Sequence, residues 1–553
     1  MYFFGGILAC VILFTGYYVM SVGSDEITVE DIAFAERIIG LNFTDAQRDS
    51  MIDGLMQHRE SYKAIRDYGL KNDIPPSLFF NPLPAGFDID IGASALHLSD
   101  IGDVRLPEDL NELAFYSIRE LAELLRTRQI TSVELTEFYI NRLRKYDPVL
   151  ECVITFTEER ATKMAQRADK EIAAGNYRGP LHGIPYGIKD LFATEGYKTT
   201  WGAMPFKDQV IDYDATVVQM LDDAGAVLVA KLTLGALAWG DVWFGGKTRN
   251  PWDPSQGSSG SSAGSAASVA GGLVPFAIGT ETWGSIVSPA TVNGVTGLRP
   301  TFGRVSRFGA MALSWSMDKV GPLTRDAEDA AIVFNAILGP DGKDQTVYDF
   351  PFYYSSDVDV SELRIGYVRE DFEADYPFKE QDSLALETLR ELGAELVPVE
   401  LPDLPVSALS FILSAEAAAV FDELTRSGKD SLMVRQIKNA WPNVFRQSRF
   451  IPAVEYINAN RIRYELIQEM HSLMESVDLY VAPSWQGPNL LLTNLTGHPA
   501  VVIPNGFSED GTPTSISFTG RLFDEGTLLA VAHAYQNATG YHRKHPDDFI
   551  GNY

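Results

Sequence analysis

Hydrophobic positions recur at helical spacing over residues 117–175 of the chain. A serine or threonine three residues ahead of a glutamate caps the start of a helix, and such capping boxes open with Ser117 and with Thr131. A third apolar stripe follows and is stopped by Gly175. The pattern therefore predicts three amphipathic helices in this part of the chain.

Beyond residue 180 the pattern changes to short apolar runs separated by glycine. Runs with the length and β-branched content of buried strands occur at 226–231, 272–278, 363–368 and 478–484. They alternate with helical stretches, and residues 407–475 are mostly helical in pattern. This alternation predicts an α/β fold in which helices cover a sheet.

The chain begins with an apolar run at residues 2–20, and its first charged side chain is Asp25. About 19 apolar residues suffice to cross a bilayer as a helix, although a cleaved export signal has a similar apolar core. We therefore expect residues 1–24 to be a signal peptide or membrane anchor. The protein is then exported (periplasmic or extracellular) or membrane-anchored rather than cytoplasmic. A helical extension (25–110) and one large domain (111–553) are expected to follow.

Charge and cysteine content argue against several classes of partner and site. Acidic residues outnumber basic ones, 74 to 45, and the net charge of −29 repels phosphate backbones, so nucleic acid is not an expected partner. The two cysteines, Cys10 and Cys152, are too far apart for a redox pair or zinc knuckle, and the eight histidines form no His-Glu-x-x-His motif. We accordingly expect no metal and no cofactor.

Residues 257–268, GSSGSSAGSAAS, have the composition of a flexible linker. The run nevertheless passes directly into an apolar segment, and its small residues allow a helix to pack closely against neighbouring backbone. Residues 279–285, GTETWGS, then present consecutive backbone N–H groups beside Ser285. Because fixed donors of that kind stabilise the oxyanion of an acyl-transfer reaction, the pattern predicts a catalytic loop.

Lys189 lies in a strand-like apolar setting within residues 179–192, GPLHGIPYGIKDLF. In a dry site the ammonium form of a lysine is disfavoured, so its pKa falls and its amine can accept a proton. A serine with a desolvated lysine is an alternative to the Ser-His-Asp arrangement for acyl transfer. The two segments together therefore indicate a serine nucleophile with a lysine base.

GIPYGIKD, GSSAGSAAS, the GTETWGS segment and the late NLTGHPAVVIPNGF closely resemble the amidase signature family, over roughly residues 110–550. The resemblance implies a large mixed central β-sheet covered by helices on both faces. It also implies a Ser–cis-Ser–Lys triad with Lys189 as base, Ser261 as bridging residue and Ser285 as nucleophile, and a cis bond between Gly260 and Ser261. The two serines stand 24 positions apart (285 minus 261), the usual interval in the family.

The implied activity is hydrolysis of an amide bond through a serine acyl-enzyme, and the expected partner is a small-molecule amide. Residues 407–475 are expected to line the acyl pocket, as the variable region of the family does. The sequence leaves the oligomeric state open. The implied oxyanion hole consists of the backbone N–H groups of Thr282, Trp283, Gly284 and Ser285.

Two positions depart from the family pattern. Glu281 stands where most relatives have aspartate, and Trp283 where most have glycine or aspartate. Trp283 either biases the pocket toward flat or apolar acyl groups or packs into the core. Relatives that grip an acidic substrate often place arginine within three residues of the nucleophile, whereas this chain has isoleucine, valine and serine at 286–288. A neutral or apolar amide is therefore the expected substrate.

Other interpretations stay open. Residues 260–264 also fit the Gly-x-Ser-x-Gly nucleophile elbow, with Ser262 as nucleophile, although residues 250–258 ahead of it are not strand-like. GGKT at 245–248 fails as a phosphate-binding loop because Asp241 occupies the first glycine position. The further alternatives are an esterase, a non-catalytic binding protein on the same fold, and a glutaminase-type subunit of a tRNA-dependent amidotransferase.

Overall fold

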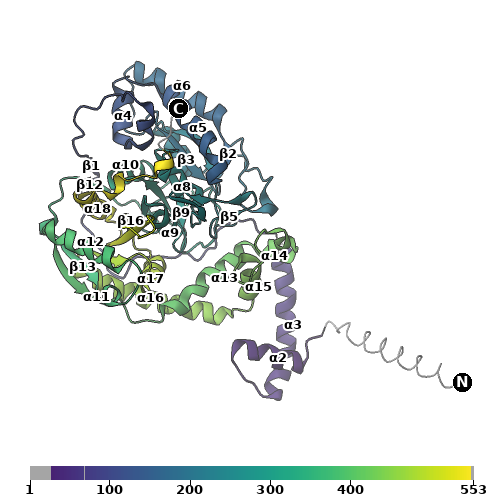
Figure 1. The fold of residues 1–553 in the computed structure, drawn as a ribbon. Helices are drawn as coiled ribbons and strands as arrows, with labels where there is room; N and C mark the ends of the chain where they lie inside the picture. Colours follow the sequence, from purple (N-terminus) through teal and green to yellow (C-terminus); the bar gives the residue numbers. More distant parts are fainter. Residues whose placement is uncertain (1–25, 68, 550–553) are drawn as a thin grey trace. The chain divides into compact units, whose positions relative to one another are not determined.

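The computed structural model describes residues 26–67 and 69–549 (Figure 1). The predicted signal peptide or anchor at 1–24 lies outside these residues. Contacts divide the chain into two units, which are residues 1–71 with 450–453 and residues 72–449 with 454–553. The domain boundaries expected from the sequence, after 24 and after 110, stay predictions.

Two helices, α2 (Val29–Ile39) and α3 (Asp45–Asp67), form most of the described part of the smaller unit. The hydroxyl of Thr28 and the side chain of Asp31 form a capping box at the start of α2. Beyond the smaller unit, residues 72–109 form little regular structure apart from the short strand β1 (Ala95–His97). Prolines concentrated near the start of this segment explain part of that irregularity, because proline has no backbone N–H to donate.

The larger unit is built on one large mixed sheet. In sheet order, its eleven strands within residues 72–549 are β14 (Glu395–Val399), β13 (Arg364–Val368), β15 (Leu479–Pro483), β17 (Pro513–Gly520), β16 (Ala500–Phe507), β10 (Thr296–Arg299), β11 (Lys319–Thr324), β9 (Phe276–Glu281), β3 (Pro185–Lys189), β4 (Val227–Leu232) and β2 (Val153–Phe156). Strand β3 is parallel to β4 and β9, and β13 is parallel to β14 and β15, whereas the other neighbours are antiparallel.

Helices cover both faces of this sheet (Figure 1). Successive residues of a strand point to opposite faces, and in β9 Ile278 packs into one apolar cluster while Ala277 packs into another. The first cluster includes residues of α10 (Ala327–Ile337) and α18 (Glu525–Thr539), and the second includes residues of α8 (Ala263–Ala270) and α9 (Val287–Asn293). This is the predicted α/β fold.

The predicted helix starts are confirmed. Helix α4 (Ile118–Arg126) begins after Ser117 and α5 (Ser132–Leu150) after Thr131, each with both hydrogen bonds of a capping box. Helix α6 (Glu158–Ala173) ends just ahead of Gly175. The apolar run at 272–278 contributes only its end to β9, because residues 271–275 turn the chain out of α8.

Residues 407–475 are mostly helical, as the sequence pattern indicates. Their helices are α13 (Phe411–Val420), α14 (Asp422–Arg426), α15 (Trp441–Ser448) and α16 (Ala453–Glu475). The larger unit also contains α7 (Thr216–Asp223), α11 (Arg369–Glu373), α12 (Lys379–Glu391) and α17 (Asn489–Thr496), with the short strands β5 (Val242–Trp243), β6 (Gly246–Lys247), β7 (Arg249–Asn250), β8 (Asp253–Gly257) and β12 (Tyr353–Ser355).

Candidate active site

Lys189 ends β3, a fully buried strand between β4 and β9. Its Nζ atom lies 2.8 Å from Ser261 Oγ and 3.0 Å from Ser262 Oγ. The hydroxyl and carbonyl oxygens of Thr280 lie 2.9 and 3.3 Å from the same nitrogen. The amine is therefore held by oxygen atoms alone, three of which belong to hydroxyl groups.

Burial governs the charge of this amine. Desolvation lowers the pKa of Lys189 to about 7, although the nearby carboxylates of Asp318 and Glu281 oppose the shift. A pKa near 7 leaves a large fraction of the amine neutral at neutral pH. A neutral amine 2.8 Å from a serine hydroxyl can accept a proton from it.

The serine loop, residues 258–262, connects β8 to α8. The peptide bond between Gly260 and Ser261 is cis. A Cβ atom at Gly260 would lie 2.0 Å from the carbonyl oxygen of Gly240, and one at Gly264 would lie 2.5 Å from another backbone carbonyl oxygen. The small residues that give this stretch the composition of a linker instead allow it to pack directly against backbone.

Residues 282–285 form the turn between β9 and α9. Because β3 and β9 are parallel, this turn lies at the same edge of the sheet as Lys189. Ser285 is 9% exposed, and its carbonyl oxygen accepts a hydrogen bond of 3.1 Å from the Ser262 N–H. Its hydroxyl makes no hydrogen bond to any residue in the described part of the chain. The structure thus brings the three predicted triad residues to one edge, with Lys189 and Ser261 in direct contact.

The backbone N–H groups of this turn are free. In the part of the chain that the structure describes, none of these N–H groups donates a hydrogen bond. Buried backbone donors are nearly always paired, so a run of four free donors next to a serine is a ready site for an oxyanion. The four residues are the predicted Thr282, Trp283, Gly284 and Ser285.

Trp283 is 44% exposed, so it does not pack into the core. Its neighbour Thr282 is held in place by Asp318, because the Thr282 hydroxyl donates to Asp318 Oδ1 over 2.6 Å. The second carboxylate oxygen of Asp318 accepts from the N–H groups of Leu313 and Ser314 at 2.8 and 2.9 Å. Asp318 therefore anchors the turn to the following loop, while the Trp283 side chain stays partly exposed.

Glu281 holds the two ends of the 282–285 turn together. Its Oε2 atom accepts from the N–H groups of Ile286 and Val287 at 2.8 and 2.9 Å. Its Oε1 atom accepts from Arg299 Nη1 at 2.9 Å and from Asn494 Nδ2 at 2.7 Å. Burial opposes ionisation of Glu281, but the Arg299 charge and these hydrogen bonds lower its pKa to about 2. The fixed carboxylate thus ties Glu281, ahead of the turn, to the two residues that follow Ser285.

Ser262, the alternative nucleophile, is fully buried. Its hydroxyl donates to the Thr280 carbonyl oxygen over 3.1 Å and accepts from the Thr280 N–H over 3.2 Å. Residues 253–257 ahead of the loop do form a short strand, β8, contrary to the expectation from sequence. A hydroxyl enclosed in this way is not the exposed hydroxyl of a nucleophile elbow.

Several residues of this site were not predicted to belong to it. Thr280 is part of the GTETWGS segment, so a signal for it was present in the sequence. Asp318 and Arg299 share no motif with the serine loop, and strand pairing brings them to the site, as in the antiparallel register of Lys319 with Glu281. Asn494 comes from helix α17 and opens the NLTGHPAVVIPNGF segment, so a signal for it was also present in the sequence.

A profile of the Amidase family matches residues 134–491. The chain belongs to the amidase family and is an enzyme that hydrolyses amide bonds. It is 33% identical to a glutamyl-tRNA(Gln) amidotransferase subunit of Carboxydothermus hydrogenoformans over 484 residues, 79% of this chain and 99% of that protein. The corresponding subunit of Acinetobacter baumannii is 35% identical over 485 residues, 79% of this chain and 98% of that protein.

Solved structures agree with this assignment. The peptide amidase from Stenotrophomonas maltophilia matches with a TM-score of 0.70 and 29% identity, covering 79% of this chain and 99% of that one. The corresponding glutamyl-tRNA(Gln) amidotransferase subunit from Thermotoga maritima matches with a TM-score of 0.67 and 27% identity, covering 81% of this chain and 100% of that one.

These relatives correct the predicted partners. A small-molecule amide without nucleic acid was expected, whereas the similar curated proteins are, by name, subunits of an amidotransferase that acts with glutamyl-tRNA(Gln). The prediction rested on the net charge of −29. Net charge averages over the whole surface and does not describe one face of a subunit, so it was not sufficient to exclude such partners.

The same relatives contradict the predicted export or membrane anchoring. That prediction rested on the apolar composition of residues 2–20, which lie outside the described residues and carry none of the basic residues that open an export signal. Among the helices of residues 26–67 and 69–549, none combines the length and the apolar character that crossing a membrane requires.

Proposed function

We propose that this amidase works through a serine acyl-enzyme in which Ser285 is the nucleophile, Ser261 the bridging residue and Lys189 the base. The observation that carries the proposal is the fully buried Lys189 amine, with a pKa of about 7, at 2.8 Å from the Ser261 hydroxyl. Among the described residues, no other titratable group that contacts the serine loop is both fully buried and close to neutrality in its pKa.

In the proposed reaction, neutral Lys189 takes the Ser261 proton while Ser261 takes the proton of Ser285. The Ser285 oxygen attacks the carbonyl carbon, and the free N–H groups of residues 282–285 hydrogen-bond the resulting oxyanion. The relay returns the proton to the amide nitrogen, the C–N bond breaks, and the amine leaves. Water, deprotonated by the same relay, then hydrolyses the ester and restores Ser285.

We further propose that the acyl group is neutral or apolar. The Trp441 indole donates to the Leu237 carbonyl oxygen over 2.8 Å and stacks edge-on against Trp239 at 4.5 Å between ring centroids. The adjacent Gly240 abuts Gly260 of the serine loop. Aromatic side chains thus connect helix α15 to residues 237–240, which pack against the serine loop. This contact supports the expectation that residues 407–475 line the acyl pocket.

A second candidate function is the ammonia-supplying component of a tRNA-dependent amidotransferase. It is favoured by the 33–35% identity to subunits of such enzymes over 98–99% of their length. Free glutamine is then the amide that is hydrolysed. Release of ammonia from glutamine, compared with aliphatic amides and C-terminal peptide amides, separates this candidate from an amidase for apolar acyl groups.

Labelling with a fluorophosphonate probe tests the proposed triad. The full chain is labelled, digested and mapped by mass spectrometry, in parallel with Ser285→Ala, Ser262→Ala and Lys189→Met. We expect the label on Ser285, retained in Ser262→Ala and lost in Ser285→Ala and Lys189→Met. A label on Ser262, or full labelling of Lys189→Met, would contradict the proposed roles.

A further inference from the structure

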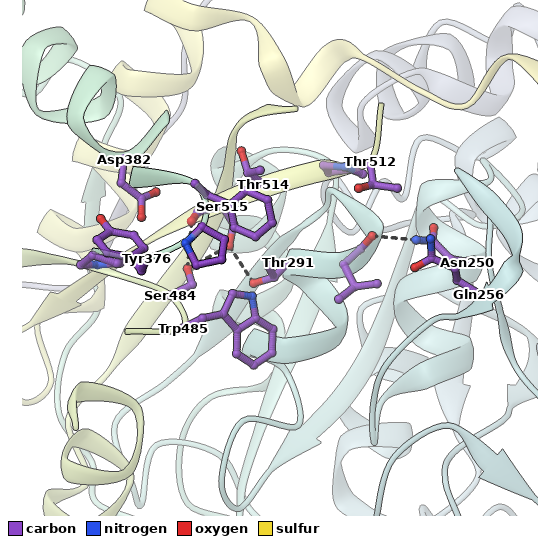
Figure 2. A pocket seen from close by; sticks show the side chains of 15 residues that line it. Asn250, Gln256, Thr291, Tyr376, Asp382, Ser484, Trp485, Thr512, Thr514 and Ser515 are labelled. Atoms are coloured by element: carbon purple, nitrogen blue, oxygen red, sulfur yellow. Dashed lines mark hydrogen bonds between the residues drawn. The ribbon is translucent and has the colours of Figure 1, made fainter. Parts of the chain in front are cut away.

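A cavity of about 150 Å³ lies away from the catalytic loop, where the C-terminal half of α9 meets the start of β17 and the end of β15 (Figure 2). Thr291, near the C-terminal end of α9, lines it. Its other walls come from residues 376–382 and 483–485. None of the triad or oxyanion-loop residues borders the cavity.

A chain of buried hydroxyl groups forms one wall (Figure 2). Thr291 Oγ1 and Ser515 Oγ lie 2.7 Å apart, and Ser515 Oγ donates to Ser484 Oγ over 2.8 Å. Ser484 continues the chain to Ser517 at 2.9 Å. Each of these side chains is buried, so their polar groups are held in place by one another rather than by solvent.

A buried carboxyl group also lines the cavity. Asp382 is 3% exposed and accepts a hydrogen bond of 2.7 Å from Asn505, which in turn accepts one of 2.8 Å from Thr514. Within the described residues no lysine, arginine or histidine pairs with Asp382. Burial raises the pKa of Asp382 to about 7, and burial beside this carboxyl also raises that of Tyr376. A buried carboxylate without a counter-ion is costly, and a cation in the cavity would relieve that cost.

Aromatic side chains flank the opening. Trp485 is 51% exposed and Phe378 is 41% exposed, and both line the cavity. Phe378 has a φ of 71°, a left-handed conformation that is unfavourable for a residue with a side chain. Exposed aromatic faces next to a carboxylate are a recurrent arrangement for binding an ammonium group, because the ring faces attract positive charge.

We propose that this cavity binds a small primary amine in its ammonium form, with Asp382 as counter-ion, the hydroxyl chain as hydrogen-bond acceptor and Trp485 over the apolar part of the molecule. An anion is disfavoured, since the lining residues include one carboxylate and no lysine, arginine or histidine. A neutral molecule would not stabilise the ionised form of Asp382.

Calorimetric titration with benzylamine tests the proposal. The full chain carries Ser285→Ala, so that turnover does not contribute and the result is independent of the proposed catalytic roles. Benzyl alcohol and benzoate serve as the neutral and anionic analogues of similar shape. We expect benzylamine to bind in the millimolar range or tighter, and both analogues to bind at least tenfold more weakly.

Substitutions of cavity-lining residues test whether benzylamine binds in this cavity. Asp382→Asn is expected to weaken benzylamine binding at least tenfold, whereas Asp329→Asn, a matched change of a buried carboxyl on α10 outside the cavity, is expected to leave it within twofold. Trp485→Ala is expected to weaken it at least threefold, and it supplies a second test if Asp382→Asn does not fold. Absence of binding at 10 mM benzylamine, equal binding of benzyl alcohol, or unchanged binding in both cavity variants would overturn the proposal.

Discussion

The carboxylate of Glu281 and the guanidinium of Arg299 form a fully buried ion pair, with 2.9 Å between Oε1 and Nη1. The same carboxylate accepts hydrogen bonds from the two N–H groups that follow Ser285 in the backbone, those of Ile286 and Val287. The position of the proposed nucleophile therefore depends on a side chain from β9 that is itself held by β10.

We predict that Glu281→Gln destabilises the protein by about 3–5 kcal/mol, because it leaves the buried charge of Arg299 without its partner. Denaturant unfolding measures the change. Glu159→Gln, which removes an exposed ion pair with Lys163, is the control and is expected to be close to wild type. Equal stability of the two variants would show that the buried pair contributes little.

The activity of the wild-type enzyme is expected to fall as pH decreases through about 7. Lys189 has a pKa of about 7, and only its neutral form accepts a proton, so the active fraction declines below that value and is constant above it. The pH dependence of kcat/KM between 5.5 and 9 measures this. Lys189→Arg stays protonated and is expected to lose about 10²-fold or more of the activity.

Lys198→Arg is the matched control for that experiment, since Lys198 is more than half exposed and pairs with Asp208 on the surface. Its pH profile is expected to coincide with that of the wild type. An acid limb centred near 4, the range of a carboxylate, would argue against Lys189 as the base.

Gly260→Ala is expected to abolish fluorophosphonate labelling of Ser285. The added Cβ would lie 2.0 Å from the carbonyl oxygen of Gly240, a backbone atom that cannot rotate away, so the serine loop must shift. Gly271→Ala, whose nearest contact is a phenylalanine side chain at 3.3 Å, serves as control and is expected to label as the wild type does. Normal labelling of Gly260→Ala would mean that the loop tolerates displacement.

Trp283→Ala is expected to change substrate preference more than stability. The side chain is 44% exposed and sits between two proposed oxyanion donors, so its removal affects the site rather than the core. We expect kcat/KM for amides of aromatic acids to drop about tenfold and that for acetamide to stay within twofold. Tyr353→Ala in β12, also at 44% exposure and outside residues 407–475, controls for loss of an exposed aromatic side chain. Equal losses for both amides would show that Trp283 does not select the acyl group.

Local sequence was sufficient for several elements of the fold. The capping boxes at Ser117 and Thr131 marked the starts of α4 and α5, because both hydrogen bonds of the box lie within four residues. The apolar run at 226–231 similarly matched β4 to within one residue at each end. Strand order could not be derived in this way, since β3 lies between β4 and β9 only through contacts between distant segments.

In the candidate site, too, residues within short motifs could be predicted, whereas contacts between distant segments could not. Lys189, Ser261 and Ser285 were identified because each lies in a short motif with a family resemblance. Asn494 also lies in such a motif, NLTGHPAVVIPNGF, but its contact with Glu281 joins residues 213 positions apart and could not be read from either segment alone. The role of Ser262 beside Lys189 was also missed, since neighbouring serines in a run of small residues cannot be ranked without the direction of each side chain.

The parallel pairing of β3 and β9 also bears on how the enzyme becomes active. Parallel neighbours need a long crossover connection, and here β4, the serine loop and α8 lie between them in the chain. Loop-closure entropy opposes the pairing of segments so distant in sequence. A chain in which β3 and β9 are not yet paired holds the serine loop without its base, so hydrolytic competence requires this long-range pair.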